Sequence, residues 1–430
     1  MINSVTLWHI TPADLGVEFM DPTDTILTAD EKLYNLVNNA DIKIDKNAYS
    51  KSNYNSLIKM QKFLSRVRDR LKSPVTFSEN FPGINNCIAK YNITETMSCY
   101  ILLSGIVVFF ERGHQIPVVE ENYFSLPAFY ERQIYEDDYC ANPEVTARKQ
   151  PLYDFLNLLW SCVDKKDFAY SSSKNFGNNG IQYTLCITMI DAPGLISNQV
   201  DLQLKKNIRA LLDTSAFNNV LKKDHWENIK QRIDNDDISD LQIKELSENL
   251  IFADNWSGVV LAGDLADNET CLRWFMDFEI FLQANWLLLY AYCENVARMD
   301  FSPVELQGIL NRAELLRTML ENDISSNMEQ CRLEMHNSLI VSSDIMTIFH
   351  RMYGMVSNKL KLKLMSAEKE KNRFALFSDL SLLIIAILQI YSVIESFLNK
   401  DQFGKNDFIS IGIIACISIV SVWIMIKGKK

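Results

Sequence analysis

Two long apolar stretches at the C-terminal end constrain this chain more than any other feature. Residues 374–398 and 408–426 are separated only by the short connection 399–407. The second stretch carries no charge over about 19 residues, which is the length that a helix needs to cross a bilayer. The first stretch carries Asp379 near its start and Glu395 near its end. We therefore expect a helical hairpin in a membrane, with the preceding chain forming a large body on that hairpin.

Basic residues flank the two stretches and predict an orientation. Lysine and arginine concentrate on the cytoplasmic side of membrane-spanning segments. The connection between the stretches holds two lysines, which two aspartates offset. A multi-pass protein with both termini in the cytoplasm is therefore expected. The flanking basic residues are Lys359, Lys361, Lys363, Lys369, Lys371, Arg373, Lys427, Lys429 and Lys430.

Polar residues fall on about one third of the circumference of the first stretch when it is drawn as a helix. Polar groups inside a membrane normally face other protein or a water-filled path. One interpretation is therefore a pore that several copies of the hairpin enclose, and the other is hydrogen bonding between helices through small polar residues. The residues predicted to line the pore are Ser378, Ser381, Gln389, Ser392, Glu395 and Ser396.

Composition limits the classes of function. The 430 residues carry a net charge of −11, whereas a general nucleic-acid-binding protein is expected to be basic. We therefore predict no direct binding of nucleic acid. The nine cysteines include no CxxC pair, which favours buried free thiols in a reducing compartment. Residues 1–15 lack a basic patch followed by an apolar core, so no cleaved signal peptide is expected.

Residues 1–270 are predicted to form a cytoplasmic α/β domain, to which the family resemblance described below assigns a sensing role. Apolar runs of strand length alternate there with helical patterns, and Pro151 is expected to open a helix that continues to Val163. Residues 200–250 are predicted to form two or three charged amphipathic helices. The expected strands are residues 5–10, 99–103, 106–110, 116–119, 181–190 and 256–262.

The helix predicted around residues 57–71 has one strongly basic face. Its apolar residues recur at helical spacing, and the helix is expected to end before Pro74. The basic face is either a solvated surface or a site for an anionic ligand. The candidate ligand-binding residues are Lys59, Lys62, Arg66 and Arg70.

Residues 271–373 are predicted to form a long helical stalk. A first helix over residues 271–299 is rich in aromatic residues, which is more typical of packing than of a ligand cage. An apolar stripe at three- and four-residue steps then runs over residues 306–364. The stripe is compatible with one continuous helix or with a break near Ser342. The two membrane-spanning helices are then expected in residues 374–430.

No constellation of catalytic residues is present in the sequence. The five histidines are scattered, without the spacing of metal ligands, and no GxSxG, HExxH or Walker motif occurs. The segment from Asp191 to Gly194 ends a predicted strand with D-x-P-G, but the glycine-rich loop that should accompany such a motif is missing. We therefore predict that the protein is not an enzyme and has no protein-bound metal.

The layout of an α/β body, long stalk helices, two C-terminal spans and a basic tail resembles the CorA family of divalent-cation transporters. The family signature is Tyr-Gly-Met-Asn at the outer end of the first span. Here Tyr391 is followed by Ser392, Val393 and Ile394, so only the tyrosine is shared. The chain is most similar in layout to CorA-like effectors of type III CRISPR systems, which lack the signature.

The resemblance implies a homopentamer in the bacterial inner membrane that acts in antiviral defence. A nucleotide-like second messenger, such as an S-adenosylmethionine–AMP conjugate, would bind the N-terminal domain and gate ion flow or membrane disruption. One alternative is a constitutive transporter for which a divalent cation is the permeant ion. The other is a membrane-anchored binding or scaffold protein. No cofactor other than such an activator is expected, and the partners would be membrane lipid and other copies of the chain.

Overall fold

A computed structural model describes most of the chain. The chain forms two compact units, and the boundary between them lies between Ser357 and Asn358. Each unit is considered by itself. The residues described are 2–20, 30–39, 42–117, 134–135, 143–164, 183–195, 200–215, 221–235, 241–247, 249–256, 258–322 and 330–398.

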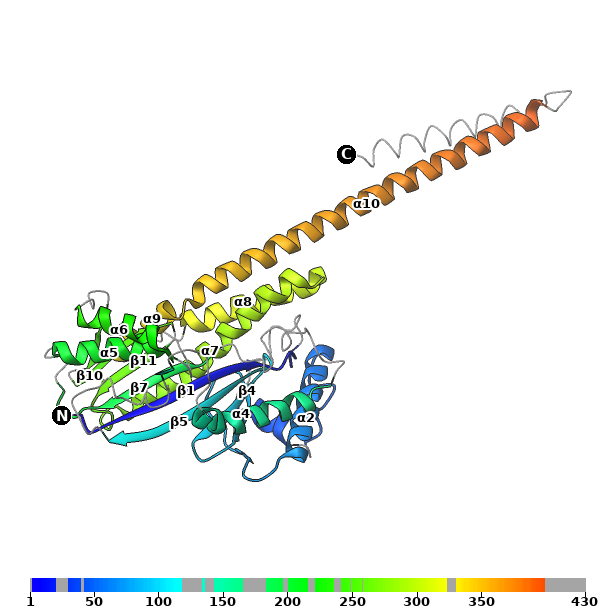
Figure 1. Ribbon diagram of the computed structural model, residues 1–430. Helices are drawn as coiled ribbons and strands as arrows, with labels where there is room; N and C mark the ends of the chain where they lie inside the picture. The colour runs from blue at the N-terminus through cyan, green and yellow to red at the C-terminus, as the bar shows by residue number, and fades with distance from the viewer. Residues whose placement is uncertain are drawn as a thin grey trace. The chain divides into compact units, whose positions relative to one another are not determined.

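A nine-stranded mixed sheet organises the first unit, with strand order β2-β3-β4-β5-β1-β7-β11-β10-β9. The long strand β1 lies in its middle, antiparallel to both β5 and β7, while β7 and β11 run parallel. Figure 1 shows β1 in blue between these neighbours. The strands are β1 Ser4–Asp14, β2 Thr76–Phe77, β3 Cys87–Asn92, β4 Met97–Leu102, β5 Ile106–Pro117, β7 Leu185–Asp191, β9 Lys244–Ser247, β10 Leu250–Asn255 and β11 Gly258–Gly263; β6 Ile134–Tyr135 and β8 Leu221–Lys222 pair separately.

Helices cover both faces of the sheet. Alternate residues of a strand point to opposite faces, and the odd-numbered Val5 of β1 packs with α5, whereas the even-numbered Thr6 and Trp8 face α7. Helices α1, α2 and α4 form a further apolar core against β3, β4 and β5. The helices are α1 Glu31–Asn38, α2 Lys51–Arg70, α4 Pro143–Cys162, α5 Leu202–Ser215, α6 Lys223–Asp234, α7 Glu269–Arg298, α8 Pro303–Asn322, α9 Gln330–Ser342 and α10 Ile345–Leu398.

Several elements agree with the sequence predictions. The expected hairpin is β4 and β5, and Gly105 in its turn has φ +82° with the carbonyl oxygen of Val17 only 1.5 Å from where a Cβ would lie. Helix α2 ends at Arg70, before the Ser73–Pro74 bond, and the apolar residues that recur along it at helical spacing are buried. The six cysteines whose side chains the structure describes are all buried free thiols, and burial raises the pKa of Cys87 to about 12.

Three local predictions are wrong. Thr11 and Pro12 lie beyond the strand expected over residues 5–10 but continue β1, because β5 extends alongside both of them. Pro151 lies inside α4 rather than at its start. Residues 244–247, predicted as helix, form the edge strand β9, because pairing with β10 overrides the charged helical pattern.

Helix α7 packs against β1 and β5 and buries most of its length. The aromatic residues of the predicted stalk helix are therefore part of the body's core. The stripe expected over residues 306–364 is not one helix. It breaks at Asp344, which has φ +56°, between α9 and α10. Helix α10 then runs for 54 residues.

The predicted fold class is wrong. A CorA-like protein with stalk helices and a two-helix transmembrane hairpin was expected, whereas the described chain is a mixed α/β protein built on the nine-stranded sheet. Among the residues that the structure describes, no helix is both long and apolar enough to span a bilayer. The first apolar stretch continues α10, whose preceding turns are highly charged. The second stretch, residues 408–426, lies outside the described residues.

Candidate functional site

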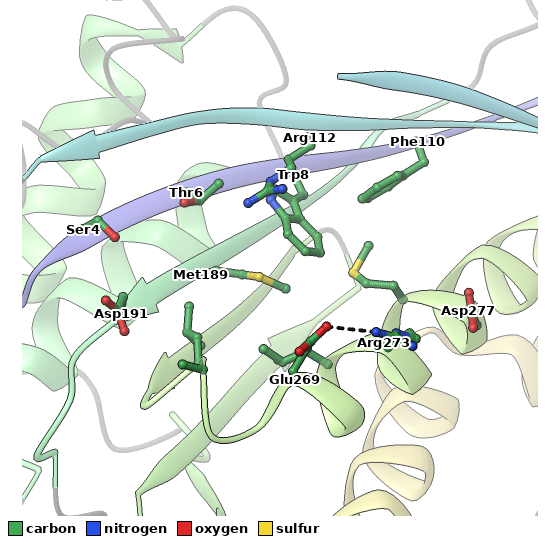
Figure 2. A pocket seen from close by; sticks show the side chains of 14 residues that line it. Ser4, Thr6, Trp8, Phe110, Arg112, Met189, Asp191, Glu269, Arg273 and Asp277 are labelled. Carbon is green, nitrogen blue, oxygen red and sulfur yellow. Dashed lines mark hydrogen bonds and ion pairs between the residues drawn. The ribbon is translucent and has the colours of Figure 1, made fainter. Parts of the chain in front are cut away.

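A cavity of about 640 Å³ opens between the α7 face of the sheet and the first turns of α7. Figure 2 shows the side chains of β1, β5 and β7 facing those of α7 across it. Its volume falls within the range of roughly 300–1,000 Å³ that is usual for small-molecule sites. The lining residues are Ser4, Thr6, Trp8, Phe110, Arg112, Met189, Asp191, Leu265, Ala266, Glu269, Leu272, Arg273, Met276 and Asp277.

An aromatic and cationic group forms the sheet side of the cavity. The rings of Trp8 and Phe110 meet edge to face with centroids 5.4 Å apart, and the guanidinium of Arg112 lies 5.8 Å from the Trp8 ring centroid. In Figure 2 the Trp8 indole extends into the cavity beside Arg112 and above Met189. The indole N–H of Trp8 has no hydrogen-bond acceptor among the described residues. Such a wall suits a flat ring system, because aromatic faces and guanidinium planes both stack well.

Three carboxylates line other parts of the cavity. Asp191 at the end of β7 accepts a hydrogen bond of 3.3 Å from the side chain of Asn3. Glu269 forms an exposed ion pair with Arg273 one turn later in α7, with 2.9 Å between nitrogen and oxygen. Burial raises the pKa of Asp277 to about 6, although Lys90 and Arg273 act to lower it. These groups accept hydrogen bonds from hydroxyl or amino groups.

The charge balance of the cavity indicates which ligands it can hold. Three carboxylates face two guanidinium groups, and apolar side chains of β7, α7 and the segment before α7 fill the space between them. A ligand with several phosphates would meet net repulsion here, whereas an aromatic heterocycle with hydroxyl or amino donors would meet complementary groups. One acidic group could still be neutralised by Arg112.

The structure places three of the four predicted basic residues around a different and smaller cavity. Lys59, Lys62 and Arg66 line a space of about 160 Å³ near the C-terminal end of α4, and Arg70 lies outside it. Lys59 Nζ donates to the backbone carbonyl of Glu18 at 2.7 Å. The volume of this cavity, about 160 Å³, leaves room only for a small anion.

Arg66 and Arg70 have structural partners in the last turn of α4 and just beyond it. Arg66 donates to the carbonyl of Cys162 at 3.2 Å and forms an ion pair of 3.6 Å with Asp164. Arg70 donates to the carbonyl oxygen and the hydroxyl oxygen of Ser161 at 3.0 and 2.9 Å. The last carbonyls of a helix lack partners within it, so these arginines cap α4 and complement its dipole.

The predicted pore-lining residues and the residues at the signature position all fall on α10. The hydroxyl of Ser381 donates to the carbonyl of Phe377 at 2.9 Å, which satisfies it within its own helix. Tyr391 is exposed. The side chains of Ser378, Gln389, Ser392, Val393, Ile394, Glu395 and Ser396 lie outside the described residues.

The sequence patterns predict a binding role for none of the residues that line the larger cavity. Among them only Asp191 belongs to a motif considered above, the D-x-P-G segment. Trp8 and Phe110 were assigned to strands, and the start of α7 to a stalk. The signal that could have identified them is the alternation of polar and apolar residues in β1, where Ser4, Thr6 and Trp8 share one face.

No family model matches the chain, and neither a curated protein nor a solved structure matches it. Within the described residues, no group of three or more histidine, cysteine, aspartate or glutamate side chains is placed to hold a metal ion. The assignment of the site therefore depends on its own geometry.

Proposed function

We propose that the unit formed by residues 1–357 is a ligand-sensing domain that binds a nucleoside-type small molecule in the cavity beneath α7. The single observation that carries the proposal is a cavity of about 640 Å³ that combines an aromatic and guanidinium wall with three carboxylates, one from β7 and two from α7. A heterocyclic base would pack between Trp8 and the apolar side chains of Leu272 and Met276. Ribose hydroxyls or amino groups would donate to Asp191 or Asp277.

This proposal refines the sequence expectation of a nucleotide-like messenger. The excess of carboxylates favours a ligand with one phosphate or none over a triphosphate. An S-adenosylmethionine–AMP conjugate carries few phosphates and so meets that charge preference, and one of its two adenosine groups would occupy the cavity. Gated ion flow, antiviral action, pentamer formation and an inner-membrane location stay predictions that follow from the resemblance alone.

Isothermal titration of the full-length protein tests the proposal. The probes are adenosine, AMP, S-adenosylmethionine, its AMP conjugate and ATP. We expect saturable binding of at least one of the first four, with ATP weaker by tenfold or more, which corresponds to about 1.4 kcal/mol. Binding should be lost in Trp8→Leu and weakened at least tenfold in Asp277→Asn, which removes a charge while preserving shape.

Trp256→Leu is the matched control, because Trp256 is an exposed tryptophan outside the cavity, with 64% of its surface accessible. Thermal unfolding of each variant establishes that it is folded. The proposal is contradicted when none of the five probes binds, or when Trp8→Leu and Trp256→Leu reduce binding equally. Preferred binding of ATP would overturn the charge argument in particular.

A further inference from the structure

A second cavity, of about 280 Å³, lies where the end of β10 meets α5 and α9. It shares no lining residue with the cavity beneath α7. At about 30 Å³ per water in the liquid, its volume corresponds to roughly nine water molecules, or a ligand of similar heavy-atom count. It is too small for a nucleoside with substituents, so it calls for a ligand of another class.

Three polar side chains from separate elements converge in this cavity. Ser338 of α9 donates to the carboxylate of Asp254 in β10, with 2.9 and 3.0 Å between the hydroxyl oxygen and the two carboxylate oxygens. Lys244 of β9 donates to the same hydroxyl. Ser338 is only 3% exposed. The serine therefore holds a lysine and an aspartate side by side at the cavity wall.

Lys244 and Asp254 retain hydrogen-bonding capacity toward a ligand. An ammonium group has three N–H donors, and Ser338 is the only hydrogen-bond partner of the Lys244 ammonium in the part of the chain that the structure describes. A carboxylate accepts about four hydrogen bonds, whereas a serine hydroxyl supplies one proton. Charged groups with unfilled capacity at a cavity wall favour a ligand that brings the complementary charges.

A second pair of opposite charges lines the α5 side of the cavity. The Nε of Arg209 donates to Asp213 at 2.9 Å, and Arg209 is 9% exposed. The four ionic groups of the wall thus cancel in formal charge, so neither a simple anion nor a simple cation is favoured. Leu212, Leu241 and Val341 add apolar surface between the pairs.

We infer that this cavity binds a zwitterionic small molecule of the free α-amino-acid class with an apolar side chain. The carboxylate of the ligand would accept hydrogen bonds from Lys244, and its ammonium would donate to Asp254. Its side chain would contact the leucines and Val341. The amino acid would thereby contact α9 near its last residue, Ser342, two residues before the Asp344 break that leads into α10.

Calorimetric titration of the full-length protein with L-alanine, L-valine, L-leucine and L-methionine tests this inference. At least one of them should bind saturably at millimolar or lower concentration. Two analogues of leucine isolate the charges: 4-methylpentanoate lacks the ammonium, and 3-methylbutylamine lacks the carboxylate. We expect each analogue to bind at least tenfold more weakly than leucine or not at all.

Variants assign any binding to this cavity. Lys244→Met keeps the length of the side chain and removes its charge, and Asp254→Asn keeps the shape of the carboxylate. Each should weaken binding of the amino acid at least tenfold, while Glu245→Gln, at an exposed neighbouring position on β9, should leave it unchanged. Trp8→Leu should also leave it unchanged, which separates this site from the proposed nucleoside site.

Three results would overturn the inference. The first is the absence of saturable binding by all four amino acids. The second is equal binding of leucine and its single-charge analogues, which would show that the paired charges do not select the ligand. The third is binding that survives both Lys244→Met and Asp254→Asn in variants that unfold at the wild-type temperature.

Discussion

At the scale of single residues, a buried ion pair joins the segment that follows β1 to helices α7 and α8. Arg312 of α8 donates to the carboxylate of Glu18 and to the hydroxyl of Tyr292 in α7, each at 2.8 Å, and Tyr292 donates to Glu18 at 2.7 Å. The side chains of the ion pair are 7% and 5% exposed. Every charge in this cluster is both paired and hydrogen-bonded, which is the condition for a buried ion pair to be tolerated.

Removing one partner of this cluster should be strongly destabilising. Arg312→Leu leaves the Glu18 carboxylate buried without its cation, so we expect the free energy of unfolding to fall by about 3–5 kcal/mol. Urea unfolding followed by circular dichroism measures it. Arg317→Leu is the control on the same helix, where the ion pairs are 42% exposed on the arginine side and should contribute less than about 1 kcal/mol. Equal losses in the two variants would refute this role.

Glu279 predicts a dependence of stability on pH. It is fully buried in α7, where burial raises the pKa of its carboxyl to about 7. Because the folded-state pKa exceeds the unfolded value of about 4.3, the folded state binds the proton more tightly. The stability that this provides is complete below about pH 4 and is lost as pH rises to about 7.

Glu279→Gln should therefore gain stability relative to wild type as pH rises from about 4 to 8, by an amount on the order of 3–4 kcal/mol. Thermal unfolding across this range measures the difference. The replacement keeps an acceptor for the side chain of Gln283, which donates to Glu279 at 2.8 Å. Glu269→Gln, exposed on the same helix, serves as control. A constant difference between Glu279→Gln and wild type at every pH would exclude this titration.

At the scale of elements, the hairpin of β4 and β5 requires glycine at its turn. Gly105→Ala would force a left-handed backbone on alanine and place its Cβ against the carbonyl of Val17. Gly194 has the same φ of +82° with no atom within 4 Å. Gly194→Ala should therefore cost about 1 kcal/mol for the backbone alone, whereas Gly105→Ala should cost several times more in chemical denaturation. Similar costs would show that the close approach relaxes freely.

Local sequence patterns predict which segments form helices and strands better than they predict which of these elements pair or pack together. The hairpin, α2, α7 and the strand before Asp191 follow from periodicity and turn residues, because those signals act within a few residues. Lys244–Ser247 form a strand only through pairing with β10, and Pro12 lies in a strand through its pairing with β5. Such tertiary effects are not contained in a local pattern.

At the scale of the whole molecule, the sequence pattern predicts a stalk where α7 is part of the core, and it does not predict the candidate site. Its aromatic residues are packing residues, as their pattern predicts, and α7 packs against β1 and β5 of the central sheet. The cavity beneath α7 brings Trp8, Arg112 and Asp277 together from positions more than one hundred residues apart in the chain. The pairing of β1 with β5 places Trp8 beside Arg112, and the packing of α7 against these strands brings Asp277 to the same cavity.

Hydrogen–deuterium exchange of the full-length protein, with and without a bound nucleoside-type ligand, tests the central claim most directly. The account predicts that protection on binding concentrates in residues 4–8, 110–112 and 269–277, which line the cavity beneath α7. Protection that instead concentrates in α2, around Lys59 and Arg66, would place the ligand at the basic cavity and contradict the account.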